Sequence, residues 1–289
     1  MTDPAESAED IEAKELMAKW EKEMGDDPGA TATDDDSLED SGPLHYDDDL
    51  EKYRRDVNPK DGELDHMVLA TADLDKAMEE FEKETGVKPV MVCSLNGLGT
   101  KSARVAFDEC CFLEIVAPDP KQTNRPLGDK LVDVAPPGVM VPLHYAVRDS
   151  NAAKYRDTKF PELGYKKTDQ VTMVAKDRGM PWKWDMVFLE GHDDGGLVPF
   201  FVDWGDAHHA AGRLPVVGSG PRVTVKAPSD HRVHKLLDDV VWIDTDESDD
   251  VGVSFAFTGK DGQSLSYSGR SPVGISFPQE GGLPVKKGT

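Results

Sequence analysis

Two stretches of the sequence decide the fold: LDHMVLATADLDKAMEEFEKETGVKPV at residues 64–90 and ARVAFDECCFLEIVAP at residues 103–118. Together they predict a strand, a helix and three further strands. Because side chains alternate along a strand, His66 shares a side with Val68 in the first strand. In the last strand Glu114 shares a side with Phe112 and Val116. A histidine and a carboxylate on strands that can lie side by side have the spacing that a metal site needs.

The helix of the first stretch is predicted from the spacing of its apolar residues, which recur at helical intervals with charged residues opposite. Thr71 or Asp73 can cap its start. Gly86 ends it, because glycine accepts the left-handed conformation that closes a helix, and Pro89 prevents any continuation. The apolar stripe consists of Leu74, Ala77, Met78, Phe81 and Thr85.

The same plan returns at residues 142–168, PLHYAVRDSNAAKYRDTKFPELGYKKT, as a strand, a helix and a glycine. His144 stands in its strand where His66 stands in the first. The separations from His66 to Gly86 and from His144 to Gly164 are both 20 residues. A fixed period of this kind indicates a repeated unit, so the sequence predicts a second module.

These residues resemble the glyoxalase-like branch of the vicinal oxygen chelate superfamily. The resemblance is carried by residues 64–87, by LNGLGTKSARVAF at 95–107, by FLEIVAPDP at 112–120 and by LVPFFVDWG at 197–205. It implies an α+β fold in which paired βαβββ modules curl into a half-open barrel around a cavity. The aromatic residues of the second module then form either its core or the wall of that cavity.

The resemblance also implies a divalent metal ion (Zn, Fe, Ni, Mn or Mg), held by the first and last strands of each module. The matching positions are His66, Glu114 and His144, while the fourth falls near Phe200 and Phe201, which cannot bind a metal. Two imidazoles and one carboxylate leave open positions on the ion, where a substrate can chelate through adjacent oxygens. The ion would act as a Lewis acid in lyase, isomerase or dioxygenase chemistry. Iron sites of this ligand type in relatives cleave aromatic diols.

Proton transfer at such a site needs a general base. Glu114 and Asp203 are the candidate catalytic residues, and His208 and His209 in the following loop are further candidates for the base or the fourth ligand. The alternative function is a metal-free protein that uses the same cavity only to bind a small molecule. The aromatic residue at the fourth position favours this alternative.

The two ends of the chain differ from this folded part. Residues 1–58 form an acidic arm with roughly 20 acidic and 6 basic residues, which is predicted to be disordered apart from one helix near Trp20. The arm is either a solubilising tail or a partner-binding segment. Residues 59–215 form the glyoxalase-like domain of two modules. Residues 216–289 predict a third, degenerate βαβββ unit, packed on the same domain and without a histidine in its first strand.

The 289-residue chain has a formal net charge of -23, which argues against nucleic acid and anionic membranes as partners because both would repel it. No apolar run approaches the length of a membrane span. Cys93, Cys110 and Cys111 are an odd number for a disulfide framework and indicate reduced thiols in a cytoplasmic protein. The expected partner is a small-molecule substrate or ligand, and the sequence leaves the oligomeric state open, a homodimer included.

Overall fold

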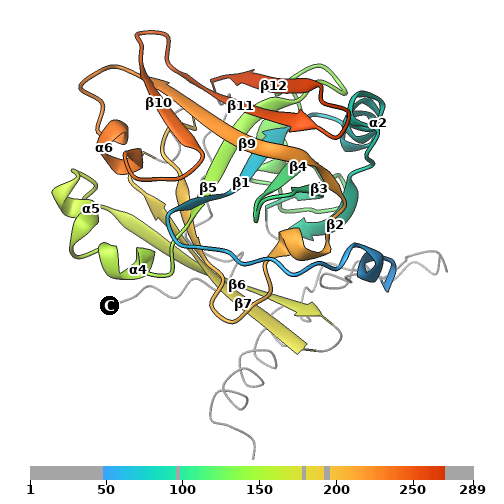
Figure 1. The fold of residues 1–289 in the computed structure, drawn as a ribbon, viewed down its shortest axis with the longest axis horizontal. Coiled ribbons are helices and arrows are strands. Elements are labelled where there is room, and N and C mark those ends of the chain that lie inside the picture. Colours follow the sequence, from blue (N-terminus) through green and yellow to red (C-terminus); the bar gives the residue numbers. More distant parts are fainter. Residues whose placement is uncertain (1–47, 96–97, 178–179, 192–195, 271–289) are drawn as a thin grey trace, which may run out of the picture.

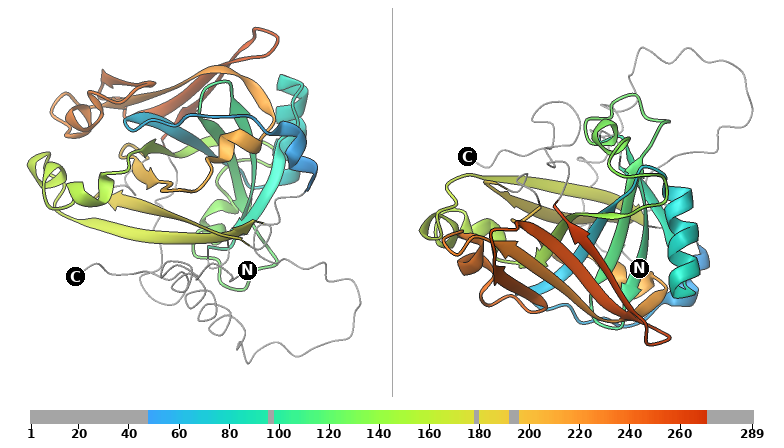
Figure 2. Two further views of the ribbon diagram at one scale, coloured as in Figure 1. Left: turned by 60° about the horizontal axis from the view of Figure 1, so that its bottom comes forward. Right: turned by 90° about the horizontal axis from the view of Figure 1, so that it is seen from above.

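The computed structural model describes residues 48–95, 98–177, 180–191 and 196–270. In this part of the chain twelve strands form one continuous sheet (Figure 1). Ten of them follow one another in the order β12-β11-β9-β3-β4-β1-β5-β8-β7-β6, while β2 pairs with β3 and β10 pairs with β9. The views in Figure 2 show how strongly this sheet curves.

The first module has the succession that its sequence predicts, one strand, one helix and three strands. β1 pairs in parallel with β4, β4 pairs antiparallel with β3, and β3 pairs antiparallel with β2. The first strand of the module therefore lies beside its last. The elements are β1 (Glu63–Ala70), α2 (Leu74–Thr85), β2 (Val90–Leu95), β3 (Thr100–Phe107) and β4 (Phe112–Pro118).

Helix α2 begins and ends as its sequence predicts. The Asp73 carboxylate accepts a hydrogen bond from the backbone N–H of Lys76 at 3.2 Å, which satisfies a donor of the first turn. Gly86 closes the helix with a φ of 70°, in the left-handed region. All five residues of the predicted apolar stripe are buried, and the four apolar ones belong to the cluster that also contains Met67 and Leu69 of β1.

The second module repeats the plan with one difference, because its helix is broken in two. A proline ring clashes with the carbonyl four residues before it in a helix, so Pro161 prevents a continuous helix through Asp157. The first helical piece therefore ends at Tyr155 and the second begins at Lys159. Gly164 follows the second piece with a φ of 88°. A connection that contains α3 (Gly128–Leu131) leads into this module. Its elements are β5 (Val141–Arg148), α4 (Ala152–Tyr155), α5 (Lys159–Glu162), β6 (Thr168–Asp177), β7 (Met180–Leu189) and β8 (Phe200–Asp203).

Strands β1 and β5 join the two modules by antiparallel pairing. In the second module β5 lies beside β8, β8 beside β7 and β7 beside β6, which repeats the pairing of the first. The modules are thus related by a pseudo-twofold axis between β1 and β5. The paired βαβββ modules agree with the sequence prediction, while closure of a half-open barrel around a cavity stays a prediction.

The C-terminal unit has the predicted succession of elements but pairs them differently from the modules. β9 lies between β10 and β11, whereas the first strand of each module lies beside its last strand. β9 also joins the first module by parallel pairing with β3. Gly218 is required in this strand, because a Cβ atom there would lie 1.9 Å from the carbonyl oxygen of Thr258. The elements are β9 (Val216–Ala227), α6 (Val233–Leu237), β10 (Ile243–Glu247), β11 (Gly252–Gly259) and β12 (Ser264–Gly269).

The folded part begins earlier than the sequence predicts. Residues 48–58, assigned above to the disordered arm, contain the 3-10 helix η1 (Asp48–Tyr53), in which Leu50 is buried. Arg55 then fixes the segment, because its guanidinium donates to the backbone carbonyls of Asp108 at 2.9 Å and Ala211 at 3.2 Å. The amino-acid composition of this segment could not reveal these tertiary contacts. The rest of the arm, with its predicted helix, lies outside the described residues.

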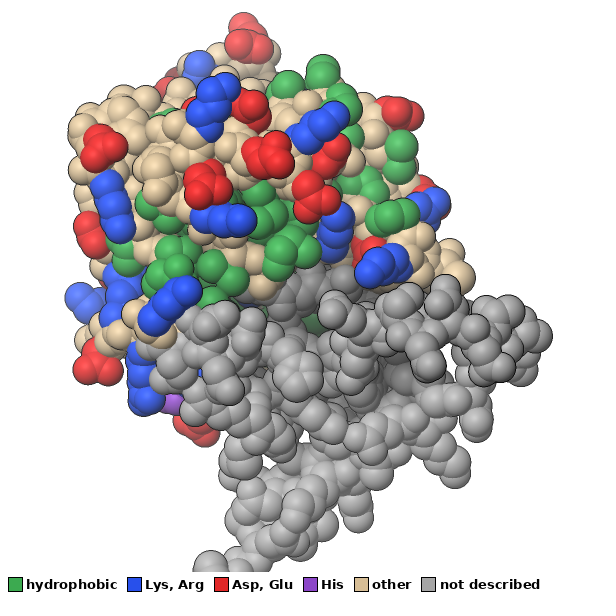
Figure 3. All heavy atoms as spheres, turned by 90° about the vertical axis from the view of Figure 1, so that its right-hand side faces the viewer, with side chains coloured by type: hydrophobic (Ala, Val, Ile, Leu, Met, Phe, Trp, Pro, Cys, Tyr) green, Lys and Arg blue, Asp and Glu red, His purple; other side chains and the backbone are tan. Residues whose placement is uncertain are grey.

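The surface of the described part mixes both signs of charge. Lys and Arg side chains are interspersed with Asp and Glu on the face shown in Figure 3. More than half of the net charge of -23 comes from residues 1–58. Within the described ranges, the helices are too short or too polar to cross a membrane.

Candidate functional site

The three sequence-predicted metal ligands lie on one face of the central strands. Val68 of β1 is the register partner of both Glu114 of β4 and His144 of β5. His66 lies two residues before Val68 and therefore on the same face. We call the face that carries these four residues the inner face. All three predicted ligands are buried on it, with exposed fractions of 7%, 6% and 2% for His66, Glu114 and His144.

The strand register identifies the fourth position of the pseudo-symmetric site. The twofold relation between β1 and β5 places Ala146 where Val68 stands, two residues after the histidine of each module. Glu114 is the partner of Val68, and Phe200 is the partner of Ala146. Phe200, rather than Phe201, therefore occupies the position on β8 that Glu114 occupies on β4.

Glu114 is engaged by an arginine on the neighbouring strand. Arg104 of β3 is its register partner, and the Nη2 of Arg104 lies 2.9 Å from the Oε1 of Glu114. Burial raises the pKa of Glu114, but the charges of Arg104 and His66 and a hydrogen bond from Ser102 outweigh it, so the pKa lies below its usual range. Glu114 is therefore an ionised carboxylate with a positive partner inside the protein.

The second module carries an aromatic pair where the first carries this ion pair. Phe188 of β7 is the register partner of Phe200, as Arg104 is of Glu114. The two phenylalanine rings stack with centroids 5.2 Å apart. The inner face is thus polar on the side of the first module and aromatic on the side of the second.

The two imidazoles lie between these halves. The His66 ring stacks on Phe112 with centroids 4.4 Å apart and meets the edge of Phe200 at 5.3 Å. The His144 ring lies 5.2 Å from Phe200. Each histidine uses Nδ1 inside the protein: His66 towards the Asp65 carboxylate at 2.6 Å, and His144 towards the carbonyl of Tyr145 at 3.1 Å.

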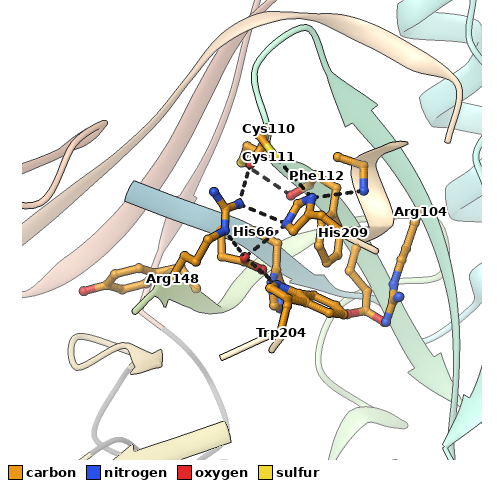
Figure 4. A network of polar contacts seen from close by, with 12 residues as sticks. His66, Arg104, Cys110, Cys111, Phe112, Arg148, Trp204 and His209 are labelled. Carbon is orange, nitrogen blue, oxygen red and sulfur yellow. Dashed lines mark hydrogen bonds and ion pairs between the residues drawn. The ribbon is translucent and has the colours of Figure 1, made fainter. Parts of the chain in front are cut away.

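A buried polar network that the sequence analysis missed contains Arg148, Trp204 and His209 (Figure 4), and Asp65 is its centre. The side chain of Asp65 is fully buried, and its Oδ2 accepts from Trp204 Nε1 at 2.9 Å and Arg148 Nε at 3.0 Å and lies 3.1 Å from His209 Nε2. Burial raises the pKa of Asp65, but the interactions with His209 and His66 hold it well below its usual range. A signal for this network exists in the sequence, since Asp65 and Arg148 are charged residues in strands that are mostly apolar.

His209, a sequence candidate for a base or ligand, belongs to this network. Its Nδ1 accepts from the backbone N–H of Ala211 at 3.3 Å and lies 3.4 Å from Cys110 Sγ, while its Nε2 lies 3.1 Å from Asp65 Oδ2 and 3.0 Å from Arg148 Nη2. Burial lowers the pKa of His209, and it is neutral near pH 7, while Arg148 supplies the positive charge beside Asp65. His209 supports the site from behind Asp65.

Asp203, the other candidate base, points away from the inner face. It lies three residues after Phe200 on β8, so it shares the opposite face with Phe201, and its carboxylate accepts from the backbone N–H of Gly205 at 2.9 Å. Asp203 is thus not brought together with Glu114, and its catalytic role stays a prediction. Sequence spacing gave its distance along the strand but not the face.

His208 lies elsewhere again, at the wall of a surface cleft. This cleft has a volume of about 240 Å³. It is lined by His208, His209 and three arginines, Arg54, Arg55 and Arg213. His66, Glu114 and His144 do not line it. His208 is therefore separated from the inner face, with His209 between.

The inner face does not fit the four-ligand metal site that the resemblance implies. Phe200 occupies the fourth position, and Arg104 already neutralises Glu114 at 2.9 Å. In the described ranges, no three or more His, Cys, Asp and Glu side chains are grouped so that they could hold a metal ion.

Comparison with known proteins gives one family. The model of the glyoxalase-like domain matches residues 64–241. No curated protein matches the sequence. Among solved structures, methylmalonyl-CoA epimerase from Mycobacterium tuberculosis is 18% identical, with 49% of this chain and 87% of that chain covered and a TM-score of 0.35. A hypothetical protein from Staphylococcus aureus is 13% identical, with 71% and 84% covered and a TM-score of 0.42.

Both TM-scores are too low for an argument about function, so the assignment rests on the family model and on the paired modules. The model spans more than half of the 289 residues. This chain therefore belongs to the glyoxalase-like domain family, within the vicinal oxygen chelate superfamily.

Proposed function

We propose that this protein binds a small molecule with a flat apolar body and adjacent oxygen groups on the inner face, without a metal ion. The observation that carries the proposal is the difference between the modules at matching positions. Arg104 and Glu114 form an ion pair in the first, and Phe188 and Phe200 form a stacked pair in the second. Small-molecule sites combine an apolar lining with a few polar groups in this way.

The residues divide the recognition between them. Phe200 meets the edge of the His66 ring and is the proposed aromatic contact for the flat body of the ligand, while Phe112 is already stacked on His66. Arg104 carries N–H donors for a ligand oxygen, and the imidazole of His66 offers Nε2, since its Nδ1 is engaged with Asp65. A ligand with two adjacent oxygens on an aromatic ring matches this arrangement.

Catechol, phenol and cyclohexanol are suitable probes. Catechol and phenol differ in the second oxygen, and phenol and cyclohexanol differ in the aromatic ring. We expect catechol to bind to the purified, chelator-treated protein more tightly than the other two, as measured by calorimetric titration. Phe200→Leu should weaken catechol binding roughly two- to tenfold, because a stacking contact contributes about 0.5–1.5 kcal/mol. Phe201→Leu is the matched control, since Phe201 lies on the other face of the same strand. Equal affinities for all three probes would contradict the proposal.

A second candidate keeps the metal on three donors, His66, Glu114 and His144, for lyase, isomerase or dioxygenase chemistry. It is favoured by the imidazoles alone: histidines that bind metals usually donate their other ring N–H to a carboxylate or a backbone carbonyl, as both do here. Metal analysis by mass spectrometry on the wild-type protein and on His66→Ala separates the candidates. Stoichiometric metal that is lost in His66→Ala supports the second candidate and overturns the metal-free proposal.

A further inference from the structure

The backbone of β1 is irregular at Asp65, next to the inner face. The register with β5 shifts between Leu64 and His66, so Asp65 has no partner there. This bulge allows two consecutive residues, Asp65 and His66, to contact each other through their side chains, with Oδ1 and Nδ1 2.6 Å apart.

The other contacts of Asp65 establish which atom carries the proton in this hydrogen bond. The Nε1 of Trp204 and the Nε of Arg148 can only donate, and both lie within 3.0 Å of Oδ2. The Nε2 of His209 lies 3.1 Å from the same oxygen. Asp65 is thus an ionised acceptor, and the proton between Asp65 and His66 belongs to Nδ1 of His66.

We propose that Asp65 is a positioning residue that fixes His66 in the tautomer with a proton on Nδ1, so that Nε2 takes a proton or hydrogen bond from an O–H group of the ligand. This inference rests on the proposed function for the identity of the ligand group. The inference goes beyond that function because Asp65 acts only through His66 and contributes no atom to the inner face. His144 holds the same tautomer, but through the carbonyl of Tyr145, which no side-chain replacement removes.

Asp65→Asn makes the idea testable. An asparagine side chain has one accepting oxygen and one donating amide group. Trp204 and Arg148 can only donate, so the oxygen is held towards them and the amide N–H faces Nδ1 of His66. Nδ1 must then accept, and the proton of His66 moves to Nε2. A purely structural role for Asp65 does not produce this reversal.

The measurement is nitrogen NMR of the full chain with labelled histidine rings at pH 8, where an ordinary histidine with a pKa of about 6.5 is neutral. Signals of His66 are identified by their loss in His66→Gln. We expect the wild-type protein to show Nδ1–H at His66 and Asp65→Asn to show Nε2–H. His144 is an internal control, and its tautomer should not change.

Glu63→Gln is the matched variant. It also removes one carboxylate next to Arg148, whose Nη1 lies 3.6 Å from Glu63, but it does not touch His66. We expect it to leave the tautomer of His66 and the affinity for catechol as they are. Asp65→Asn should weaken catechol binding at least tenfold.

Three results overturn the proposal: Nε2–H at His66 in the wild-type protein, protons on both nitrogens at pH 8, or an unchanged tautomer in Asp65→Asn. The first two do not need Asp65→Asn, so the proposal can fail even if that variant does not fold. If the tautomers behave as expected but no probe binds the wild-type protein, the role of Asp65 stands and the proposed function fails.

Discussion

Phe200 occupies on β8 the position that Glu114 occupies on β4, on the same face of the sheet. Each lies beside the residue that follows its module's histidine by two positions, Ala146 for Phe200 and Val68 for Glu114. The two modules repeat each other in backbone but not in chemistry at this point. Glu114 has a positive partner, Arg104, and Phe200 has an aromatic partner, Phe188. A site that is symmetric in its framework is thereby divided into a polar half and an aromatic half.

A carboxylate at position 200 should restore the missing fourth ligand. We expect Phe200→Glu to gain zinc binding, because two imidazoles and two carboxylates then share one face. The measurement is calorimetric titration with zinc after treatment with a chelator. Phe200→Gln is the control, since it has the same size as glutamate but no charge. Equal zinc affinity of the Glu and Gln variants would show that position 200 is not a ligand position.

Removal of Arg104 should expose the cost of its buried partner. Arg104→Met leaves the Glu114 carboxylate, whose side chain is 8% exposed, without its counter-charge. We expect a loss of about 3 kcal/mol in the free energy of unfolding, as is usual when one member of a buried pair is removed. Urea denaturation measures it. The double variant Arg104→Met with Glu114→Leu should recover most of the loss, and a double variant as unstable as the single one would contradict this explanation.

The ionisation of Glu114 predicts how stability changes in acid. Burial raises the pKa of Glu114, but Arg104 and His66 lower it by a larger amount. The folded-state pKa therefore lies below the unfolded value of 4.5. The stability that this carboxylate contributes is present above pH 4.5 and is lost as the pH falls through the folded pKa. Unfolding free energies from pH 7 down to pH 3 should therefore fall more steeply for the wild type than for Glu114→Gln. Parallel curves would count against an ionised Glu114.

Arg55 should stabilise the entry of the chain into the fold. Its guanidinium donates to the backbone carbonyls of Asp108 and Ala211, which lie far from it in the sequence. We expect Arg55→Ala to lower the free energy of unfolding by about 2–3 kcal/mol, since hydrogen bonds to charged groups contribute about 1.5–3 kcal/mol each and part is recovered by water. Amide exchange of residues 54–59 should also become faster.

Lys52→Ala is the control for Arg55, because the Lys52 side chain is exposed and its Nζ lies over the neighbouring Tyr53 ring. An exposed substitution of this kind changes stability by about 0.5 kcal/mol or less. If both variants have the same small effect, the segment is not fixed by Arg55.

The sequence by itself determined the local elements and the repeat. The stripe from Leu74 to Thr85, the cap at Asp73 and the glycines at 86 and 164 depend on residues within one turn, so helix α2 and the two modules could be predicted from spacing alone. The alternation of side chains along a strand likewise placed His66 on the side of Val68.

Only the tertiary structure decided the partners of those residues. Arg104 meets Glu114 because β3 pairs with β4 in one register, and Asp65 contacts residues 148, 204 and 209 because a bulge in β1 turns it beside His66. Asp203 faces away from the site although it is only three residues from Phe200. Register and bulges depend on contacts between strands that are far apart in the chain, and a shift of one residue moves a side chain to the other face. That is why the sequence named three residues of the inner face but missed Asp65, Arg104 and Arg148.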